Sequence, residues 1–204
     1  MKKAANRAKE KGQSQCSKIV KAARKNQVEF FDDLSDKQLK RLKLNCLDEV
    51  GYSPLHHAAR KGSIAFLKRL LNLGVDQEIG NSAANWTPLQ EAAYWGQLKV
   101  VKILLNQGSN PNHITTKGQN TLHIAAQGRY GNEGKITKTL IQVGADVNQI
   151  DKKGWSPLFD AAENGCFDCV NELLQHGGQP SIKGDKGKTA KDIAGRLGFS
   201  EISQ

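Results

Sequence analysis

The sequence predicts an all-α fold built from repeated pairs of short helices. One segment recurs five times, as YSPLHHAARKG (52–62), WTPLQEAAYWG (86–96), QNTLHIAAQG (119–128), WSPLFDAAENG (155–165) and KTAKDIAGRLG (188–198). Its third position falls at 54, 88, 121, 157 and 190, a spacing of 33 to 36 residues. An apolar stretch that ends in a glycine follows each of the first four segments. A fixed period of this length is typical of an array of repeated units, each of which packs on its neighbours.

The first helix of each unit is predicted to begin at the third position of the segment. Ser53, Thr87 and Ser156 each precede a proline. A hydroxyl at the N-cap accepts a hydrogen bond from an amide of the first turn, and proline at the first helical position loses no intrahelical bond. Paired alanines follow in four of the five segments. Their small side chains allow neighbouring helices to approach closely.

The second helix of each unit carries an apolar stripe and ends at a glycine. Leucine pairs occur at 70–71, 104–105 and 173–174, at the spacing expected for the buried face of a helix. The glycines at 74, 108, 144 and 177 can end these helices because glycine adopts the left-handed conformation without a steric penalty.

These residues resemble the ankyrin repeat, a pattern of about 33 residues in which TPLH opens the first helix. The string GADVN (144–148) also resembles the usual ending of that repeat. The resemblance covers roughly residues 46–200. It implies a solenoid of helix-turn-helix units joined by β-hairpin fingers, with four full repeats between degenerate N- and C-terminal caps.

The expected organisation has seven parts. They are a basic arm (1–15), an N-terminal capping repeat (16–45), repeat 1 (46–79), repeat 2 (80–114), repeat 3 with an extended turn (115–150), repeat 4 (151–182) and a C-terminal capping repeat (183–204).

Several positions depart from the family pattern. Repeat 3 has Asn120 where a hydroxyl residue is expected, and its turn GRYGNEG is three residues longer, which indicates either a tolerated insertion or a binding feature. The resemblance implies a structural role for His56 and His123, because the family uses this histidine to form a hydrogen bond to the adjoining turn. Gln90 and Phe159 replace it in repeats 2 and 4, and we expect this replacement to cost hydrogen bonds.

The resemblance also implies which residues face the concave groove. They are the finger residue before each first helix and the residues that flank the alanine pair. We expect the partner-binding face to comprise Tyr52, His57, Arg60, Trp86, Glu91, Tyr94, Trp95, Gln119, Trp155, Asp160 and Asn164. All three tryptophans lie in this set, and Trp, Tyr and Arg dominate binding hot spots. The alternative is that Trp86 and Trp155 only pack on neighbouring fingers and stiffen the array.

The leading functional hypothesis is a non-catalytic adaptor or scaffold that binds a peptide or domain of a partner protein in this groove. A sharper alternative comes from repeats 2 and 4, which resemble the histone-reading subset of ankyrin domains. This resemblance implies that Glu91 and Asp160 pair with a basic peptide while Trp86, Tyr94 and Trp95 cover its alkyl stems. No catalytic, metal or cofactor motif is evident. We expect a monomer. Asn112 and Asn148 are further candidates for hydroxylation by an asparaginyl hydroxylase.

Charge is concentrated at the N-terminus. The net charge is +10, and residues 1–25 hold nine Lys or Arg against one acidic residue. This arm is either a solvated leader or a region of weak, nonspecific contact with nucleic acid. No apolar run is long enough to span a membrane, and no secretory signal is evident. We therefore expect an intracellular protein, cytoplasmic or nuclear, in which all four cysteines (16, 46, 166 and 169) are reduced thiols.

Overall fold

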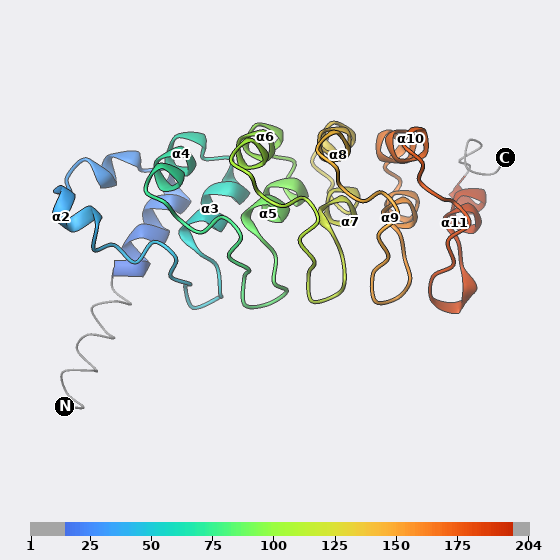
Figure 1. Ribbon diagram of the computed structural model, residues 1–204, viewed down its shortest axis with the longest axis horizontal. Coiled ribbons are helices and arrows are strands. Elements are labelled where there is room, and N and C mark those ends of the chain that lie inside the picture. Colours follow the sequence, from blue (N-terminus) through green and yellow to red (C-terminus); the bar gives the residue numbers. More distant parts are fainter. Residues whose placement is uncertain (1–14, 198–204) are drawn as a thin grey trace, which may run out of the picture. The chain divides into compact units, whose positions relative to one another are not determined.

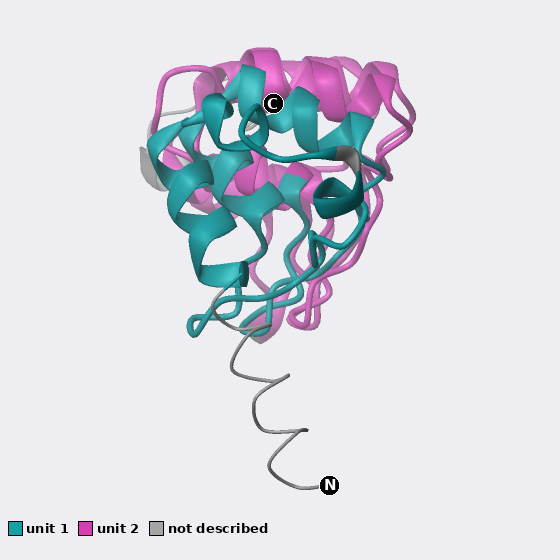
Figure 2. Cartoon of the chain, turned by 90° about the vertical axis from the view of Figure 1, so that its left-hand side faces the viewer, with its two compact units in different colours: residues 1–88 teal, residues 89–204 magenta. Residues whose placement is uncertain are grey.

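The computed structural model describes residues 15–197. The predicted arm, except Gln15, and residues 198–204 of the predicted C-terminal cap lie outside the described residues. The chain divides into two compact units, residues 1–88 and 89–204, which are coloured separately in Figure 2. No helix in the described part is long and apolar enough to cross a membrane.

Short helices form the first unit. A helix over residues 15–25 is followed by the 3-10 helix η1 (Val28–Phe31) and by α2 (Asp36–Leu39). The pair α3 (Pro54–Lys61) and α4 (Ile64–Asn72) follows. Phe66, Leu67 and Leu70 of α4 are fully buried, and the ring of Phe66 packs against that of Phe31 at a centroid distance of 5.0 Å.

The second unit continues the same helix-turn-helix pattern. Its elements are α5 (Pro88–Tyr94), which begins at the boundary, α6 (Leu98–Asn106), α7 (Thr121–Ala126), α8 (Glu133–Gln142), α9 (Pro157–Asn164), α10 (Phe167–Gln175), the 3-10 helix η2 (Asp185–Gly187) and α11 (Ala190–Leu197). The first helices α7, α9 and α11 stand side by side, and the second helices α8 and α10 form a layer over them (Figure 1). The predicted all-α repeat fold is confirmed.

A finger precedes each first helix, and backbone hydrogen bonds close it. In repeat 4, Asp151 N donates to Trp155 O over 2.9 Å and Gly154 N donates to Asp151 O over 2.9 Å. No strand is assigned within residues 15–197, so these fingers are tight turns rather than extended hairpins. Each finger has too few hydrogen-bonded residue pairs to form a β-ladder.

The first helices begin as the sequence predicts. Ser53 accepts a bond from His56 N, and His56 Nδ1 accepts one from Ser53 N, which completes a capping box. Asn120 makes the same arrangement with His123. Its Nδ2 also donates to Asp146 O over 2.8 Å. Asn120 therefore replaces the expected hydroxyl residue without loss of the cap.

A histidine side chain of α3 and of α7 holds the finger that follows. Nε2 of His56 lies 2.8 Å from Trp86 O, and Nε2 of His123 lies 3.0 Å from Trp155 O. Both histidines are buried, and burial lowers the pKa of His56 to about 4 and also lowers the pKa of His123. Both rings are therefore neutral at pH 7, as a structural role requires.

Gln90 and Phe159, which replace this histidine in repeats 2 and 4, make different contacts. Gln90 Nε2 donates to His113 O over 2.9 Å, so the expectation that glutamine costs this bond is wrong. The amide is long enough to reach a carbonyl of the next finger. Phe159 instead stacks on Trp155, with ring centroids 4.6 Å apart and an interplanar angle of 21°.

Asparagines at the repeat ends make a second set of bonds to the next repeat. Asn112 donates to Gly144 O and accepts from Asp146 N, and Asn148 makes the equivalent bonds with Gly177 O and Gln179 N. Each amide is thus engaged at both its oxygen and its nitrogen. Their hydroxylation stays a prediction, and it would require an enzyme to reach side chains that already bridge two repeats.

The expectation of four reduced thiols is wrong, because two disulfides are present. Cys16 is joined to Cys46, and Cys166 is joined to Cys169. The helix over residues 15–25 packs with Cys16 buried, which brings it against a residue 30 positions away. Spacing in the sequence does not reveal this packing.

We predict that His123→Leu destabilises the chain by about 1–3 kcal/mol, because it removes the bond to Trp155 O and half of the capping box. His123→Gln should cost less, since Gln90 reaches the next finger from the same position of its own repeat. Urea unfolding followed by circular dichroism measures both values. Equal losses in the two variants would contradict this role of the side-chain bond.

We predict that Cys16→Ser with Cys46→Ser lowers the free energy of unfolding by about 3 kcal/mol, because the disulfide closes a long loop of the unfolded chain. The control is Cys166→Ser with Cys169→Ser, which opens a loop with a sequence separation of 3 and should cost less. Urea midpoints without reductant test the difference. No loss in the first variant would contradict the stabilising effect.

Candidate functional site

A cavity of about 660 Å³ lies in the second unit. Its walls come from two kinds of element. The fingers of repeats 3 and 4 contribute Thr116, Lys117, Gln119, Asp151, Lys152, Lys153 and Trp155, and the ends of the first helices contribute Tyr94, Gln127, Arg129, Asp160, Glu163 and Asn164. The cavity therefore occupies the angle between fingers and helices, where the sequence predicts the binding face.

Five of the predicted site residues line this one cavity: Tyr94, Gln119, Trp155, Asp160 and Asn164. Two others in the same unit do not line it. Trp95 Nε1 donates to Glu91 Oε2 over 3.2 Å, and Glu91 is only 2% exposed. This contact orients the indole and places the Glu91 carboxylate in the protein interior.

Trp155 forms a fixed wall of the cavity. Phe159 stacks on one face of its ring, so the Lys153 ammonium, 4.5 Å from the indole centroid, has room only over the other face. The indole Nε1 is buried and has no hydrogen-bond partner among the described residues. Gly184 packs against the indole edge, where an added Cβ would lie 1.9 Å from Cδ1 of the ring. Neighbours therefore hold the ring in place.

An aromatic cluster stands at one end of the site. Tyr94, Trp95 and Tyr130 lie with ring centroids 4.9 to 6.3 Å apart. Tyr130 belongs to the lengthened turn of repeat 3 and is 49% exposed. Tyr130 is not among the predicted site residues, although an aromatic residue inside an inserted turn is a signal that points to it.

The lengthened turn is ordered by its own polar contacts. Glu133 accepts hydrogen bonds from the backbone amides of Tyr130 and Gly131. Asn132 Nδ2 donates to Gly96 O over 2.9 Å. The extra residues therefore hold Tyr130 against the end of α5.

The acidic residues of the cavity are mostly buried. Asp151 is 8% exposed, and its Oδ1 accepts from Lys153 N and Trp155 N at 2.8 and 3.0 Å. Asp160 is 2% exposed and accepts from Gln127 Nε2 over 3.0 Å. Burial raises the pKa of Asp160 to about 7. Its carboxyl group is therefore mostly protonated between about pH 4 and pH 7, where an ordinary aspartate is charged.

The exposed ionisable residues of the cavity are predominantly basic. They are Lys117, Arg129, Lys152, Lys153 and Glu163. The four basic residues are not among the predicted site residues, because a basic residue in a turn is usually an ordinary solvated side chain. Their gathering on one cavity is visible only once the fingers stand next to one another.

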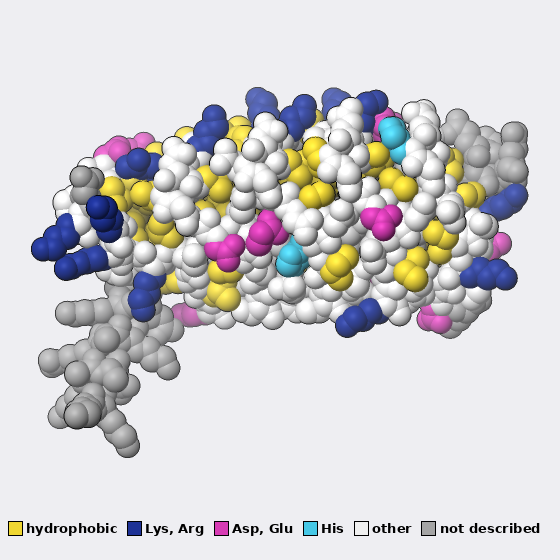
Figure 3. All heavy atoms as spheres, viewed as in Figure 1, with side chains coloured by type: hydrophobic (Ala, Val, Ile, Leu, Met, Phe, Trp, Pro, Cys, Tyr) yellow, Lys and Arg dark blue, Asp and Glu magenta, His cyan; other side chains and the backbone are white. Residues whose placement is uncertain are grey.

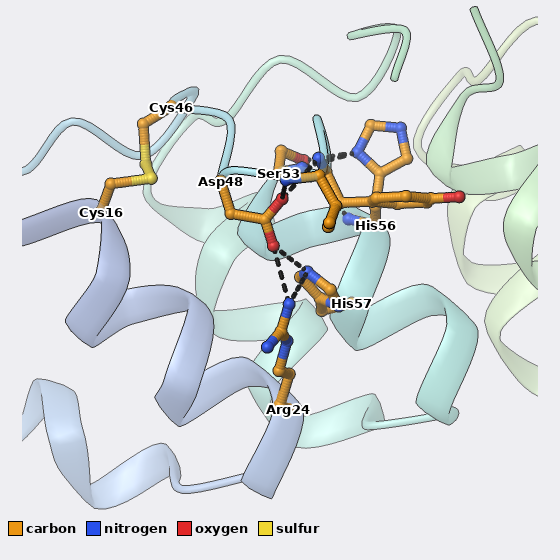
Figure 4. A network of polar contacts seen from close by, with 9 residues as sticks. Cys16, Arg24, Cys46, Asp48, Ser53, His56 and His57 are labelled. Atoms are coloured by element: carbon orange, nitrogen blue, oxygen red, sulfur yellow. Dashed lines mark hydrogen bonds and ion pairs between the residues drawn. A yellow bond between two sulfur atoms is a disulfide. The ribbon is translucent and has the colours of Figure 1, made fainter. Parts of the chain in front are cut away.

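His57, a predicted site residue of the first unit, belongs to a polar network with Arg24 and Asp48 (Figure 4). His57 Nε2 lies 2.8 Å from Asp48 Oδ2, and Arg24 pairs with the same oxygen at 2.9 Å. Burial lowers the pKa of His57, although the bond to Asp48 opposes that effect. Burial acts to raise the pKa of Asp48, but bonds from Tyr52 N and His57 hold it below its ordinary value. His57 is 7% exposed, so little of its side chain is presented to solvent.

The other three predicted site residues of this unit are half-buried. The ring of Tyr52 stands 5.7 Å from that of His57. Trp86 contributes its carbonyl to the bond with His56, and Arg60 lies in the last turn of α3. Within the described residues, no group of three or more His, Cys, Asp and Glu could hold a metal ion.

The pattern of helices, fingers and histidine bonds agrees with a comparison to known families. The family described as "Ankyrin repeats (3 copies)" matches residues 19–115 and 107–184. The chain belongs to the ankyrin-repeat family. Ankyrin repeats generally mediate protein–protein interaction, and the family is typically non-catalytic.

Curated relatives share short stretches with the chain. Human ankyrin repeat and SOCS box protein 3 is 38% identical over 72 residues, 34% of this chain and 14% of that protein. A Caenorhabditis elegans homolog of transient receptor potential cation channel subfamily A member 1 is 42% identical over 86 residues, 42% of this chain and 7% of that protein. Mouse protein phosphatase 1 regulatory subunit 12A is 35% identical over 75 residues, 37% of this chain and 7% of that protein. The chain thus matches only a small part of each.

We predict that Asp160→Asn removes a pH dependence of stability. The unfolded chain releases the Asp160 proton near 3.8 and the folded chain near 7, so this carboxyl lowers the free energy of unfolding progressively as pH rises between these values. Asparagine keeps an oxygen that can accept from Gln127. The variant should match wild type below pH 4 and exceed its stability above pH 7 by up to about 4 kcal/mol.

Urea unfolding of wild type and Asp160→Asn across this range measures that difference. A constant difference at every pH would contradict the raised pKa.

Proposed function

We propose that this ankyrin-repeat chain is a protein-interaction module that binds a segment of a partner protein in the cavity of its second unit. The observation that carries the proposal is the wall formed by Trp155, which is fixed by Phe159, Lys153 and Gly184 beside a cavity of about 660 Å³. A side chain held in place before binding loses little conformational freedom on binding.

The aromatic cluster of Tyr94, Trp95 and Tyr130 supports the same proposal. Tyr94 reaches the cavity itself, and Tyr130 is about half exposed beside it. Tyrosine and tryptophan supply much of the binding energy at protein interfaces because they bury large areas with few rotatable bonds. Five predicted residues on one cavity and this adjoining cluster make the second unit the better candidate for the binding face.

The histone-tail alternative finds less support in the same geometry. Its acidic anchors, Glu91 and Asp160, are each only 2% exposed. Each carboxyl group already accepts a hydrogen bond from a neighbouring side chain, Trp95 Nε1 for Glu91 and Gln127 Nε2 for Asp160. The nucleic-acid alternative rests on the nine basic residues of 1–25. Four of them lie in the described helix, where Arg24 pairs with Asp48, and the other five lie outside the described residues.

We predict that Trp155→Ala removes protein partners from a pull-down that wild type retains, because it deletes the fixed wall of the cavity. The matched control is Phe167→Ala, which removes an aromatic ring that is 60% exposed at the start of α10 and does not line this cavity. Quantitative mass spectrometry compares the three samples after circular dichroism confirms that each is folded. The same partner list for Trp155→Ala and Phe167→Ala would sink the proposal.

A further inference from the structure

Basic side chains surround the cavity from both of its walls. Lys117 projects from the finger of repeat 3, and Lys152 and Lys153 project from that of repeat 4. Arg129 follows α7 on the helix side. All four residues are exposed, and Glu163 is the one exposed acidic residue among the described residues that line the cavity.

Internal partners leave most of this positive charge available. Within residues 15–197, none of the four basic residues forms a salt bridge. Lys153 lies over the Trp155 ring, and Arg129 Nη2 reaches Asn164 Oδ1 only at 3.5 Å. The Asp151 carboxylate is occupied by two backbone amides, and Asp160 is buried against Gln127.

The backbone holds two of these lysines next to each other. Lys152 N donates to Lys117 O over 2.9 Å, which ties the finger of repeat 4 to that of repeat 3. Gly118 makes this approach possible, because an added Cβ would lie 2.9 Å from Lys152 N. The backbones of the two lysines are thus held together, and an anion bound between their side chains would lower the repulsion between the two charges.

We propose that the segment bound in this cavity is acidic, with Asp or Glu carboxylates paired to Lys117, Lys152 and Arg129 and an apolar side chain placed against Trp155 and Tyr94. This inference rests on the proposed function and names its partner class. Single exposed ion pairs contribute little, so affinity comes from several pairs together with contact on the aromatic wall. Charge complementarity would also speed association and make it sensitive to salt.

The test is fluorescence anisotropy with the full chain and a short labelled peptide of alternating glutamate and leucine. Two companion peptides replace every glutamate with glutamine or with lysine. The variant is Lys117→Glu with Lys152→Glu. Its matched control is Lys99→Glu with Lys102→Glu, which makes the same charge change at exposed positions of α6. Basic side chains stand along the edge formed by α6 and α8, away from the fingers (Figure 3).

We expect the glutamate peptide to bind wild type at least about tenfold more tightly than the glutamine peptide, a difference of about 1.4 kcal/mol. The Lys117→Glu/Lys152→Glu variant should lose about that factor, while the control changes less than about twofold. Added salt should weaken binding of the glutamate peptide to wild type. The neutral pair Lys117→Gln and Lys152→Gln should give an intermediate loss, and thermal melts verify that all variants are folded.

Several results would overturn the acidic-segment proposal. They are equal binding of the glutamate and glutamine peptides or no binding of either, tighter binding of the lysine peptide, and equal losses in the cavity variant and the α6 control. A single-stranded oligonucleotide with the same net charge as the glutamate peptide is a further probe. If it binds more tightly than that peptide, and if this binding depends on Lys117, the proposal is overturned as well. None of these results would contradict the proposed function, which is tested separately by the comparison of Trp155→Ala with Phe167→Ala.

Discussion

The hydrogen bond from a first helix to a carbonyl of the next finger is the contact on which the described repeats depend. Nε2 of His123 reaches Trp155 O, and Gln90 makes a comparable bond to His113 O. Short helices of six to ten residues gain little stability alone. In α3 and α7 a buried, neutral imidazole joins the helix to the following turn, and in α5 the Gln90 amide makes a comparable bond, so neighbouring repeats are coupled.

That coupling also shapes the candidate site. Because its carbonyl is held by His123 and its ring by Phe159, Trp155 stands in one orientation beside the cavity. The replacement of histidine by Phe159 in repeat 4 exchanges a hydrogen bond for a ring contact. The site and the scaffold thus use the same residues, and removal of Trp155 is expected to affect binding and local packing together. The Phe167→Ala control and the folding checks address this point.

The repeat pattern predicted part of the site and missed another part for a physical reason. The rule that finger and helix-end residues face one groove brought Tyr94, Gln119, Trp155, Asp160 and Asn164 to the same cavity. The pattern could not indicate that Asp160 is buried against Gln127, since the two residues are 33 positions apart. Nor could it show that Lys117 and Lys152 meet, because a backbone bond between two fingers joins them.

The sequence by itself determined the helices, their caps and their glycine stops, because these depend on residues within a few positions of one another. It also determined the family, since the period and variants of the TPLH segment persist along the chain. Tertiary structure alone decided the pairing of Cys16 with Cys46, the place of Tyr130 over Trp95 and the exposure of each charge. Those properties depend on distances between residues far apart in the chain, which local chemistry does not specify.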